Sequence, residues 1–153
     1  MESNVRGYAI RAATRFLLDH DDVRSGVPGD VLEKLALAEP SLQAGDWYPR
    51  SQLRAIYETI AKAAPSDAEA YARLERCGAA TADAAIAGYM RLVLKILTPR
   101  LFAAKFPGFW ARDHKDGKAS VHFPEGDSYM LFEIAEVGDF SHIGPVAAGL
   151  VKA

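Results

Sequence analysis

Hydrophobic residues recur every three or four positions along the first two-thirds of the chain, the spacing of a helix face turned toward a core. This spacing predicts six helices, over residues 5–16, 31–38, 53–64, 67–78, 86–97 and 98–110. In the first of them Val5 and Phe16 share one face, and Asn4 is the expected N-cap. The turn before the third helix presents two large aromatics, Trp47 and Tyr48.

Several helix ends are marked by particular residues. Ser66 and Glu69 form a capping box, in which each side chain bonds a backbone amide of the first turn. Gly78 is the expected stop of that helix, because glycine adopts the left-handed conformation of a C-terminal cap without strain. Thr98 is the expected cap of the last of the six helices, and Pro107 predicts a kink or a short break within it.

The pattern changes to strict polar–apolar alternation over residues 118–123, which is typical of a strand with one buried face. After a turn, residues 128–137 supply the partner strand, in which Phe132 and Ile134 share a face. A last helix is expected over residues 141–151, weakened by its glycines and proline. The C-terminal part therefore predicts a β-hairpin followed by a helix.

Together these elements predict an α+β fold, with an N-terminal half of about six helices packed on a C-terminal β-hairpin or small antiparallel sheet with a final helix. Two strands alone are marginally stable, so the hairpin must pack on helices or pair with further strands. The chain has 153 residues without a linker or repeat, and residues 1–153 are therefore expected to form a single domain.

Composition narrows the functional classes. The net charge is −2 and the arginines form no basic stripe, so neither nucleic acid nor an anionic membrane is an expected partner. Cys77 is the one cysteine, which excludes an internal disulfide and fits a reducing compartment. The N-terminus is polar, and the most apolar stretch, residues 89–97, is too short and too charged to span a bilayer. We therefore expect a cytoplasmic protein without a membrane span.

Candidate catalytic chemistry is sparse. The chain has neither a Gly-x-Ser-x-Gly elbow nor a glycine-rich phosphate loop. Cys77 lacks the cationic surroundings that lower the pKa of a thiol and is interpreted as a core residue. His114 and His122 flank acidic residues without the spacing of metal ligands, and His122 is expected to be solvated. The charged run at residues 112–116 is interpreted as a solvated helix end. We expect neither an enzyme nor a metal or cofactor site.

The aromatic residues are the stronger lead. Trp47, Tyr48, Tyr89, Trp110 and Phe132 are the candidate walls of an apolar pocket between the helices and the hairpin. The polar tips of tryptophan and tyrosine need hydrogen-bond partners when buried, which favours a pocket rim or an interface over the deep core. Ordinary core packing, a ligand pocket and an assembly surface all remain open for these residues.

Several blocks of the chain, taken in order, resemble an uncharacterised paralogous family best represented in myxobacteria. The blocks are the helix that begins near Val5, residues 26–28, 47–49, 101–110 and 116–118, and the helix around residues 144–150. More distantly, the layout is similar to the superfamily that holds haem–nitric-oxide-binding domains, vinyl-reductase-type ligand-binding domains and transport-complex subunits of Golgi traffic. The resemblance implies an α+β fold with a pocket between the helices and a C-terminal sheet, and it implies sensing or assembly rather than catalysis.

This sequence departs from the distant superfamily in its haem site and in its C-terminal strands. Its haem-binding members need a histidine before the hairpin, and Pro99 stands there in this chain. Their Tyr-x-Ser-x-Arg clamp for the haem propionates would fall on Phe123, Glu125 and Asp127, which removes the chemical basis for haem binding. Its members also continue into further strands, whereas this sequence stops at Ala153. We therefore expect either a shortened member or a sheet that a partner chain completes.

The leading hypothesis from the sequence is a non-enzymatic ligand-binding or sensory domain that takes a small apolar molecule without haem. The alternative is an assembly module, a homodimer or an adaptor, that uses the same aromatic surface and the open sheet edge. A ligand domain predicts a closed cavity of roughly a few hundred cubic ångströms. An assembly module predicts a symmetric contact of more than ~1,000 Å² over a filled core.

Overall fold

The computed structural model describes residues 4–86, 97–115, 117–123, 131–136 and 142–152. Within them the fold is α+β, with helices in the N-terminal half, a C-terminal hairpin and a final helix, as the sequence predicts. The elements in chain order are β1 (Asn4–Arg6), α1 (Gly7–Asp19), α2 (Asp21–Arg24), α3 (Gly29–Ala38), the 3₁₀ turn η1 (Glu39–Ser41), β2 (Trp47–Pro49), α4 (Arg50–Lys62), α5 (Asp67–Ala85), α7 (Pro99–Asp113), β3 (Lys118–His122), β4 (Leu131–Ala135) and α8 (Ile143–Lys152).

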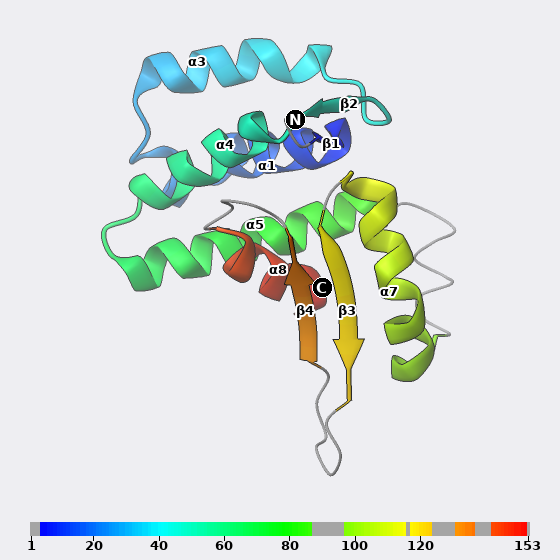
Figure 1. Cartoon of the computed structure of the whole chain (residues 1–153). Coiled ribbons are helices and arrows are strands. Elements are labelled where there is room, and N and C mark those ends of the chain that lie inside the picture. Colours follow the sequence, from blue (N-terminus) through cyan, green and yellow to red (C-terminus); the bar gives the residue numbers. More distant parts are fainter. Residues whose placement is uncertain (1–3, 87–96, 116, 124–130, 137–141, 153) are drawn as a thin grey trace.

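Helix α5 lies between the two halves of the molecule (Figure 1). It packs on α1 and α4 with one side and on α8 with another. Helix α7 runs beside β3, which pairs with β4 in the antiparallel hairpin. Helix α5 therefore contacts both the N-terminal helices and the C-terminal part.

The main core lies where α1, α4 and α5 meet. Leu17, Ile60 and Cys77, one from each helix, have no exposed surface. Burial of each such aliphatic side chain stabilises the fold by about 1.5–3 kcal/mol relative to leaving it in water. The predicted core position of Cys77 is confirmed, and burial raises the pKa of its thiol to about 12.

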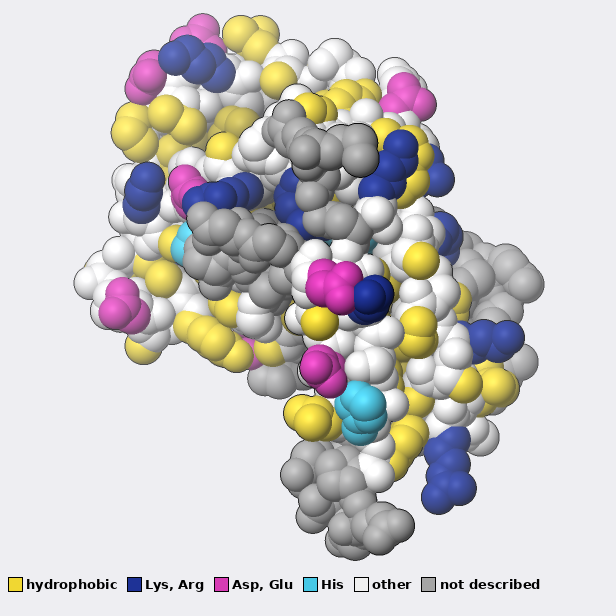
Figure 2. All heavy atoms as spheres, in the orientation of Figure 1, with side chains coloured by type: hydrophobic (Ala, Val, Ile, Leu, Met, Phe, Trp, Pro, Cys, Tyr) yellow, Lys and Arg dark blue, Asp and Glu magenta, His cyan; other side chains and the backbone are white. Residues whose placement is uncertain are grey.

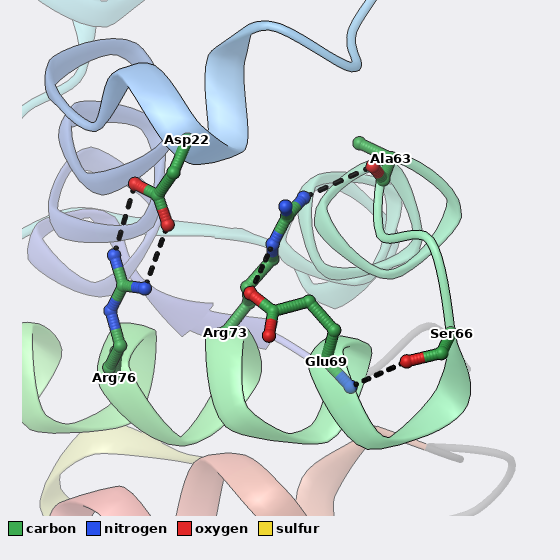
Figure 3. A network of polar contacts seen from close by, with 6 residues as sticks. All are labelled: Asp22, Ala63, Ser66, Glu69, Arg73 and Arg76. Atoms are coloured by element: carbon green, nitrogen blue, oxygen red, sulfur yellow. Dashed lines mark hydrogen bonds and ion pairs between the residues drawn. The ribbon is translucent and has the colours of Figure 1, made fainter.

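The N-terminal half of α5 is fixed by polar contacts to the preceding helices (Figure 3). The Ser66 hydroxyl accepts a hydrogen bond from the Glu69 amide at 3.2 Å, so the predicted cap is confirmed. The side chain of Glu69 instead pairs with Arg73, whose guanidinium also donates to the Ala63 carbonyl at the end of α4. One turn further along, Arg76 binds the Asp22 carboxylate at 2.8 and 3.3 Å and ties α5 to α2.

Helix α5 does not stop at Gly78, and the sequence prediction is wrong there. The helix continues to Ala85, and within it Gly78 faces α8, where a Cβ atom would overlap the backbone carbonyl of Val146. Gly149 of α8 makes the reciprocal approach to the Glu75 carbonyl of α5. The glycine is required by close helix packing rather than by a helix end.

Two predictions near the N-terminus are also corrected. Val5 lies in the short strand β1 instead of a helix, and α1 begins at Gly7 with no side-chain cap from Asn4 or any other residue. Trp47 lies in strand β2 rather than in the turn, because β2 pairs antiparallel with β1 and places Tyr48 opposite Val5. Both strands have three residues, too few for alternation to be recognised in the sequence.

The C-terminal elements follow the prediction more closely. Thr98 caps α7 by accepting from the Leu101 amide at 3.3 Å, as predicted. The short break considered at Pro107 is absent, because the helix continues through this residue to Asp113. Strand β3 ends at His122, and β4 occupies the middle of the predicted partner strand. The final helix begins two residues later than predicted, at Ile143. Of the predicted helix at residues 86–97, residues 87–96 lie outside the described residues, and Leu97 is not helical.

Candidate functional site

A cavity of about 140 Å³ lies among α1, α4, α5, α7, β4 and α8. Its lining is predominantly apolar, and the described residues that take part in it are Tyr8, Ala9, Leu53, Tyr57, Thr81, Ala82, Ala85, Ile86, Phe102, Phe106, Phe109, Trp110, Arg112, Asp113, His114, Phe132, Ile134, Val146 and Ala147. The volume is smaller than the few hundred cubic ångströms expected from the sequence. It is close to the roughly 150 Å³ that admits a molecule the size of benzene.

One face of α7 supplies the aromatic wall of the cavity. Phe102, Phe106, Phe109 and Trp110 are spaced at positions i, i+4, i+7 and i+8, which brings them onto one side of a helix. The helix is held in this orientation by packing against β3. The sequence already indicated that these residues share one helix face, because helical spacing persists across Pro107.

The hairpin contributes the facing aromatic ring. Phe132 and Ile134 are two apart in β4 and therefore point to the same side of the sheet, where both line the cavity. The ring of Phe132 contacts Phe106 edge-on, with centroids 5.0 Å apart, and it lies 6.2 Å from Phe102. Such edge-to-face pairs favour a fixed ring arrangement and contribute about 0.5–1.5 kcal/mol each beyond burial.

The C-terminal end of α7 makes one end of the cavity polar. Arg112 donates two hydrogen bonds to the Asp113 carboxylate, at 2.8 and 2.6 Å. The pKa of the Tyr8 hydroxyl is raised, mainly by burial and further by the charge of Asp113 and a hydrogen bond to it. The carboxylate of Asp113 therefore already has a cationic partner in Arg112 and a hydrogen-bond donor in the Tyr8 hydroxyl.

His114 follows α7 directly and is the least satisfied polar residue of this end. Its ring stacks on Trp110, with centroids 3.9 Å apart and planes 12° from parallel. Its Nδ1 is buried without a hydrogen-bond partner, which costs about 1–3 kcal/mol. The pKa of His114 is lowered to about 4, first by burial and then by the positive charge of Arg50, against the opposing charge of Asp113. The imidazole is therefore neutral at pH 7.

The structure brings together two of the five residues proposed from the sequence as pocket walls. Trp110 is 5% exposed and lies on the cavity beside His114, while Phe132 lines the cavity from the hairpin. Tyr89 lies outside the described residues. Trp47 and Tyr48 are not among the lining residues and have a different environment.

Trp47 and Tyr48 lie on β2, where they connect the N-terminal elements. The guanidinium of Arg6 lies over the Trp47 ring at 4.0 Å, and the Lys115 ammonium lies 4.8 Å from the same ring. The Tyr48 hydroxyl accepts a hydrogen bond from the Gln43 amide at 2.9 Å. The Tyr48 hydroxyl therefore has a hydrogen-bond partner and the face of the Trp47 ring has two cations near it, and neither contact involves the cavity.

Sequence reasoning missed the polar end of the cavity. The run at residues 112–116 was expected to be solvated, but the Asp113 side chain is only 14% exposed and His114 is partly buried. A usable signal was present, because Trp110 and His114 are four residues apart and stack across one helical turn. The participation of Tyr8 depends on how α1 packs near the end of α7, which local spacing does not encode.

The remaining histidine of the metal hypothesis is on the surface, as predicted. His122 is exposed in β3 and lies 3.3 Å from the Glu133 carboxylate across the hairpin. Among the residues that the structure describes, no group of three or more histidine, cysteine, aspartate or glutamate side chains is placed to hold a metal ion. Within the same residues, no helix is both long enough and apolar enough to cross a membrane.

Comparison of the chain with protein-family models, with curated proteins and with solved structures gives no significant match. The resemblance to the myxobacterial family and to the haem–nitric-oxide-binding superfamily therefore stays a prediction.

Proposed function

We propose that this chain is a ligand-binding domain with a sensory or regulatory role, which takes a small apolar molecule into the cavity between α5, α7, β4 and α8. The observation that carries the proposal is the unfilled space of about 140 Å³ behind a wall of aromatic rings. The cavity is open on one side, since Phe102, Phe106 and Phe132 in its lining are partly exposed, so a small molecule could enter it from solvent. Apolar walls with a few polar groups at one end are typical of small-molecule sites.

The proposed ligand is not haem. A cavity of about 140 Å³ matches a single ring rather than a macrocycle. The residues at the expected haem positions, Pro99 and Phe123, offer neither an imidazole nor a hydroxyl.

The proposed role is also non-enzymatic. A cysteine nucleophile must be a thiolate, and the thiol of Cys77 has its pKa raised to about 12 by burial. At neutral pH it stays protonated in the core. His114 is partnered by stacking on Trp110 rather than by a nucleophile.

The proposal is tested by titrating toluene in a sealed calorimeter and by following thermal unfolding. A ligand at one hundred times its dissociation constant stabilises the native state by about 2.7 kcal/mol. Ala85→Leu narrows the cavity and should reduce toluene affinity at least about tenfold, because Ala85 lines it. Ala84→Leu, on the exposed side of the same helix, is the matched control and should bind as the unsubstituted chain does.

Two results would contradict the proposal. The first is the absence of heat and of thermal stabilisation with toluene. The second is equal binding by Ala85→Leu and the unsubstituted chain, which would place the toluene elsewhere. Native mass spectrometry of protein from its own host adds a direct readout of retained ligand and of subunit count.

A second candidate function, assembly of two copies, is favoured by exposed apolar side chains on the hairpin. Phe123 is 42% exposed and Leu131 is 51% exposed, and Leu131 lies opposite His122 in the β3–β4 register. Figure 2 shows a hydrophobic side chain beside a histidine near the end of the hairpin. Pairing through this surface predicts that Leu131→Lys dissociates the dimer in sedimentation velocity, while Leu37→Lys on α3 does not. A monomer at high concentration would contradict it.

A further inference from the structure

We infer that the ligand binds in one orientation, with a hydrocarbon edge of its ring deep in the cavity and any polar group at the mouth between α7 and β4. This inference rests on the proposed function and adds a chemical class to it. The class is a single-ring molecule whose polar groups, where it has them, lie on one side only. A ring with polar groups at two opposite positions is rejected.

The mouth of the cavity lies on the side of α7 and β4. Phe102 and Phe106 of α7 and Phe132 of β4 line the cavity and are partly exposed, so this part of the lining borders solvent. A polar group of the ligand that lies beside these rings keeps its water and needs no partner from the protein.

Another part of the lining, which we call the inner end, is enclosed. It is formed by side chains that are each at most 6% exposed, from α4 (Leu53, Tyr57), α5 (Thr81, Ala82) and α8 (Val146). Three of these side chains are purely hydrocarbon. A ligand group that reaches the inner end therefore loses its water and meets mainly apolar atoms.

The two hydroxyls of the inner end are bonded within the protein. The Thr81 hydroxyl donates to the Cys77 carbonyl at 2.9 Å, and the Tyr57 hydroxyl hydrogen-bonds to Thr81. Since Thr81 has one hydroxyl hydrogen and uses it on the carbonyl, Tyr57 is the donor in the second bond. Both hydroxyl hydrogens are therefore engaged. A ligand hydroxyl placed there would lose its water and compete with these bonds.

The charged groups of the lining are also paired. Asp113 accepts two hydrogen bonds from Arg112 and interacts with the Tyr8 hydroxyl. The Nδ1 atom of His114 is enclosed by the protein, so a ligand does not reach it. For the lining residues that the structure describes, these pairings favour water at the mouth as the partner of a polar ligand group.

The test compares three para-disubstituted benzenes of nearly equal shape. p-Xylene carries two methyl groups, p-cresol one methyl and one hydroxyl, and hydroquinone two hydroxyls. Each is titrated at pH 7 in a sealed calorimeter. p-Cresol should bind within about threefold of p-xylene, because its hydroxyl stays hydrated at the mouth. Hydroquinone should bind at least about tenfold more weakly than p-cresol, because one of its hydroxyls must be buried. A uniformly apolar site would weaken binding by the same factor at both replacements.

Two further measurements locate and orient p-cresol. Ala85→Leu, which narrows the cavity, should weaken p-cresol and p-xylene alike, whereas the matched control Ala84→Leu should weaken neither. In the unsubstituted chain, nuclear Overhauser contacts should join the p-cresol methyl group to the methyl groups of Leu53 and Val146. The ring hydrogens beside its hydroxyl should instead contact Phe106.

The outcomes separate this inference from the proposed function. If the compounds bind in the cavity but the first hydroxyl costs as much affinity as the second, or more, the inference is overturned and the proposed function stands. Contacts of the p-cresol methyl group with Phe106 instead of Leu53 and Val146 overturn it in the same way. If none of the three compounds binds, or if Ala85→Leu binds them all unchanged, both proposals are overturned.

Discussion

The packed core of α1, α4 and α5 and the aromatic wall of α7 and β4 are built from equally apolar residues, but only the first is filled. Leu17 and Ile60 have no exposed surface, whereas Phe106 and Phe132 are partly exposed and border a cavity. Helix α5 takes part in both regions, since it packs on α1 and also lines the cavity. Hydrophobic spacing tells which side of an element turns inward, and it does not tell whether neighbouring elements fill the space there.

The largest expected contrast comes from truncating one side chain in each region. Leu17→Ala should lower the free energy of unfolding by about 3–4 kcal/mol, because it leaves a void in close-packed surroundings. Phe106→Ala should cost only about 1–2 kcal/mol, because part of its ring is exposed and it borders space already empty. Urea unfolding monitored by circular dichroism measures both. Equal costs would mean that the aromatic wall is packed like the core.

Acid should weaken the cavity region through His114. Its pKa is about 4 in the folded chain against 6.5 for an unperturbed histidine, so the unfolded chain binds the proton more strongly. Stability contributed by His114 is therefore full above pH 6.5 and is lost as the pH falls toward about 4. The loss reaches about 3 kcal/mol, since each tenfold difference in proton affinity corresponds to about 1.4 kcal/mol.

The measurement is the free energy of unfolding between pH 4 and 7 for the unsubstituted chain and for His114→Phe. Carboxylates titrate in both proteins, so the difference between the two curves isolates His114. Parallel curves would show that His114 is solvated in the folded state.

Enlarging a side chain should lower the stability in the packed core more than at the cavity. Ala13→Leu inserts three carbon atoms where Ala13 has no exposed surface, and overpacking there should cost about 1–3 kcal/mol. Ala85→Leu extends into the cavity and should change stability by less than about 0.5 kcal/mol, since leucine is a good helix former. Thermal unfolding of both variants checks the contrast. A large loss in Ala85→Leu would indicate that the cavity is not available space.

The smallest expected effect concerns the two helix caps. Ser66→Ala removes the cap of α5 and Thr98→Ala removes the cap of α7, and each should cost about 1 kcal/mol at its own helix. Hydrogen exchange shows whether the costs are shared. If both regions unfold together, each variant speeds exchange in α5 and α7 alike; if they unfold separately, Thr98→Ala affects α7 alone.

Signals that operate within one element were recovered from the sequence. The capping residues Ser66 and Thr98 act on amides three positions away, and Phe132 and Ile134 share a face because they are two apart in a strand. The helical spacing that begins at Phe102 likewise predicted the aromatic wall of α7. These features depend on backbone geometry alone, so the sequence contains enough information to place them.

Features that depend on distant elements were missed or misplaced. Gly78 was predicted to end a helix, but a glycine is required there because the backbone of Val146 packs against it. Val146 lies 68 positions later in the chain (146 minus 78). The pairing of Val5 with Tyr48 joins two strands too short to show a pattern. The lowered pKa of His114 likewise depends on its burial and on the charge of Arg50, which belongs to the distant helix α4. Tertiary packing overrides local signals at each of these positions.

The glycine contacts between α5 and α8 determine which elements could move if the proposed ligand bound. At Gly78 and Gly149 the backbones of α5 and α8 are already in close contact, so these two helices cannot move closer together. The proposed ligand would then be accommodated by movement of α7 and β4, which carry the aromatic rings of the cavity lining. We therefore expect the proposed ligand to displace the hairpin, at the far end of the molecule from α3, more than it displaces α8 (Figure 1).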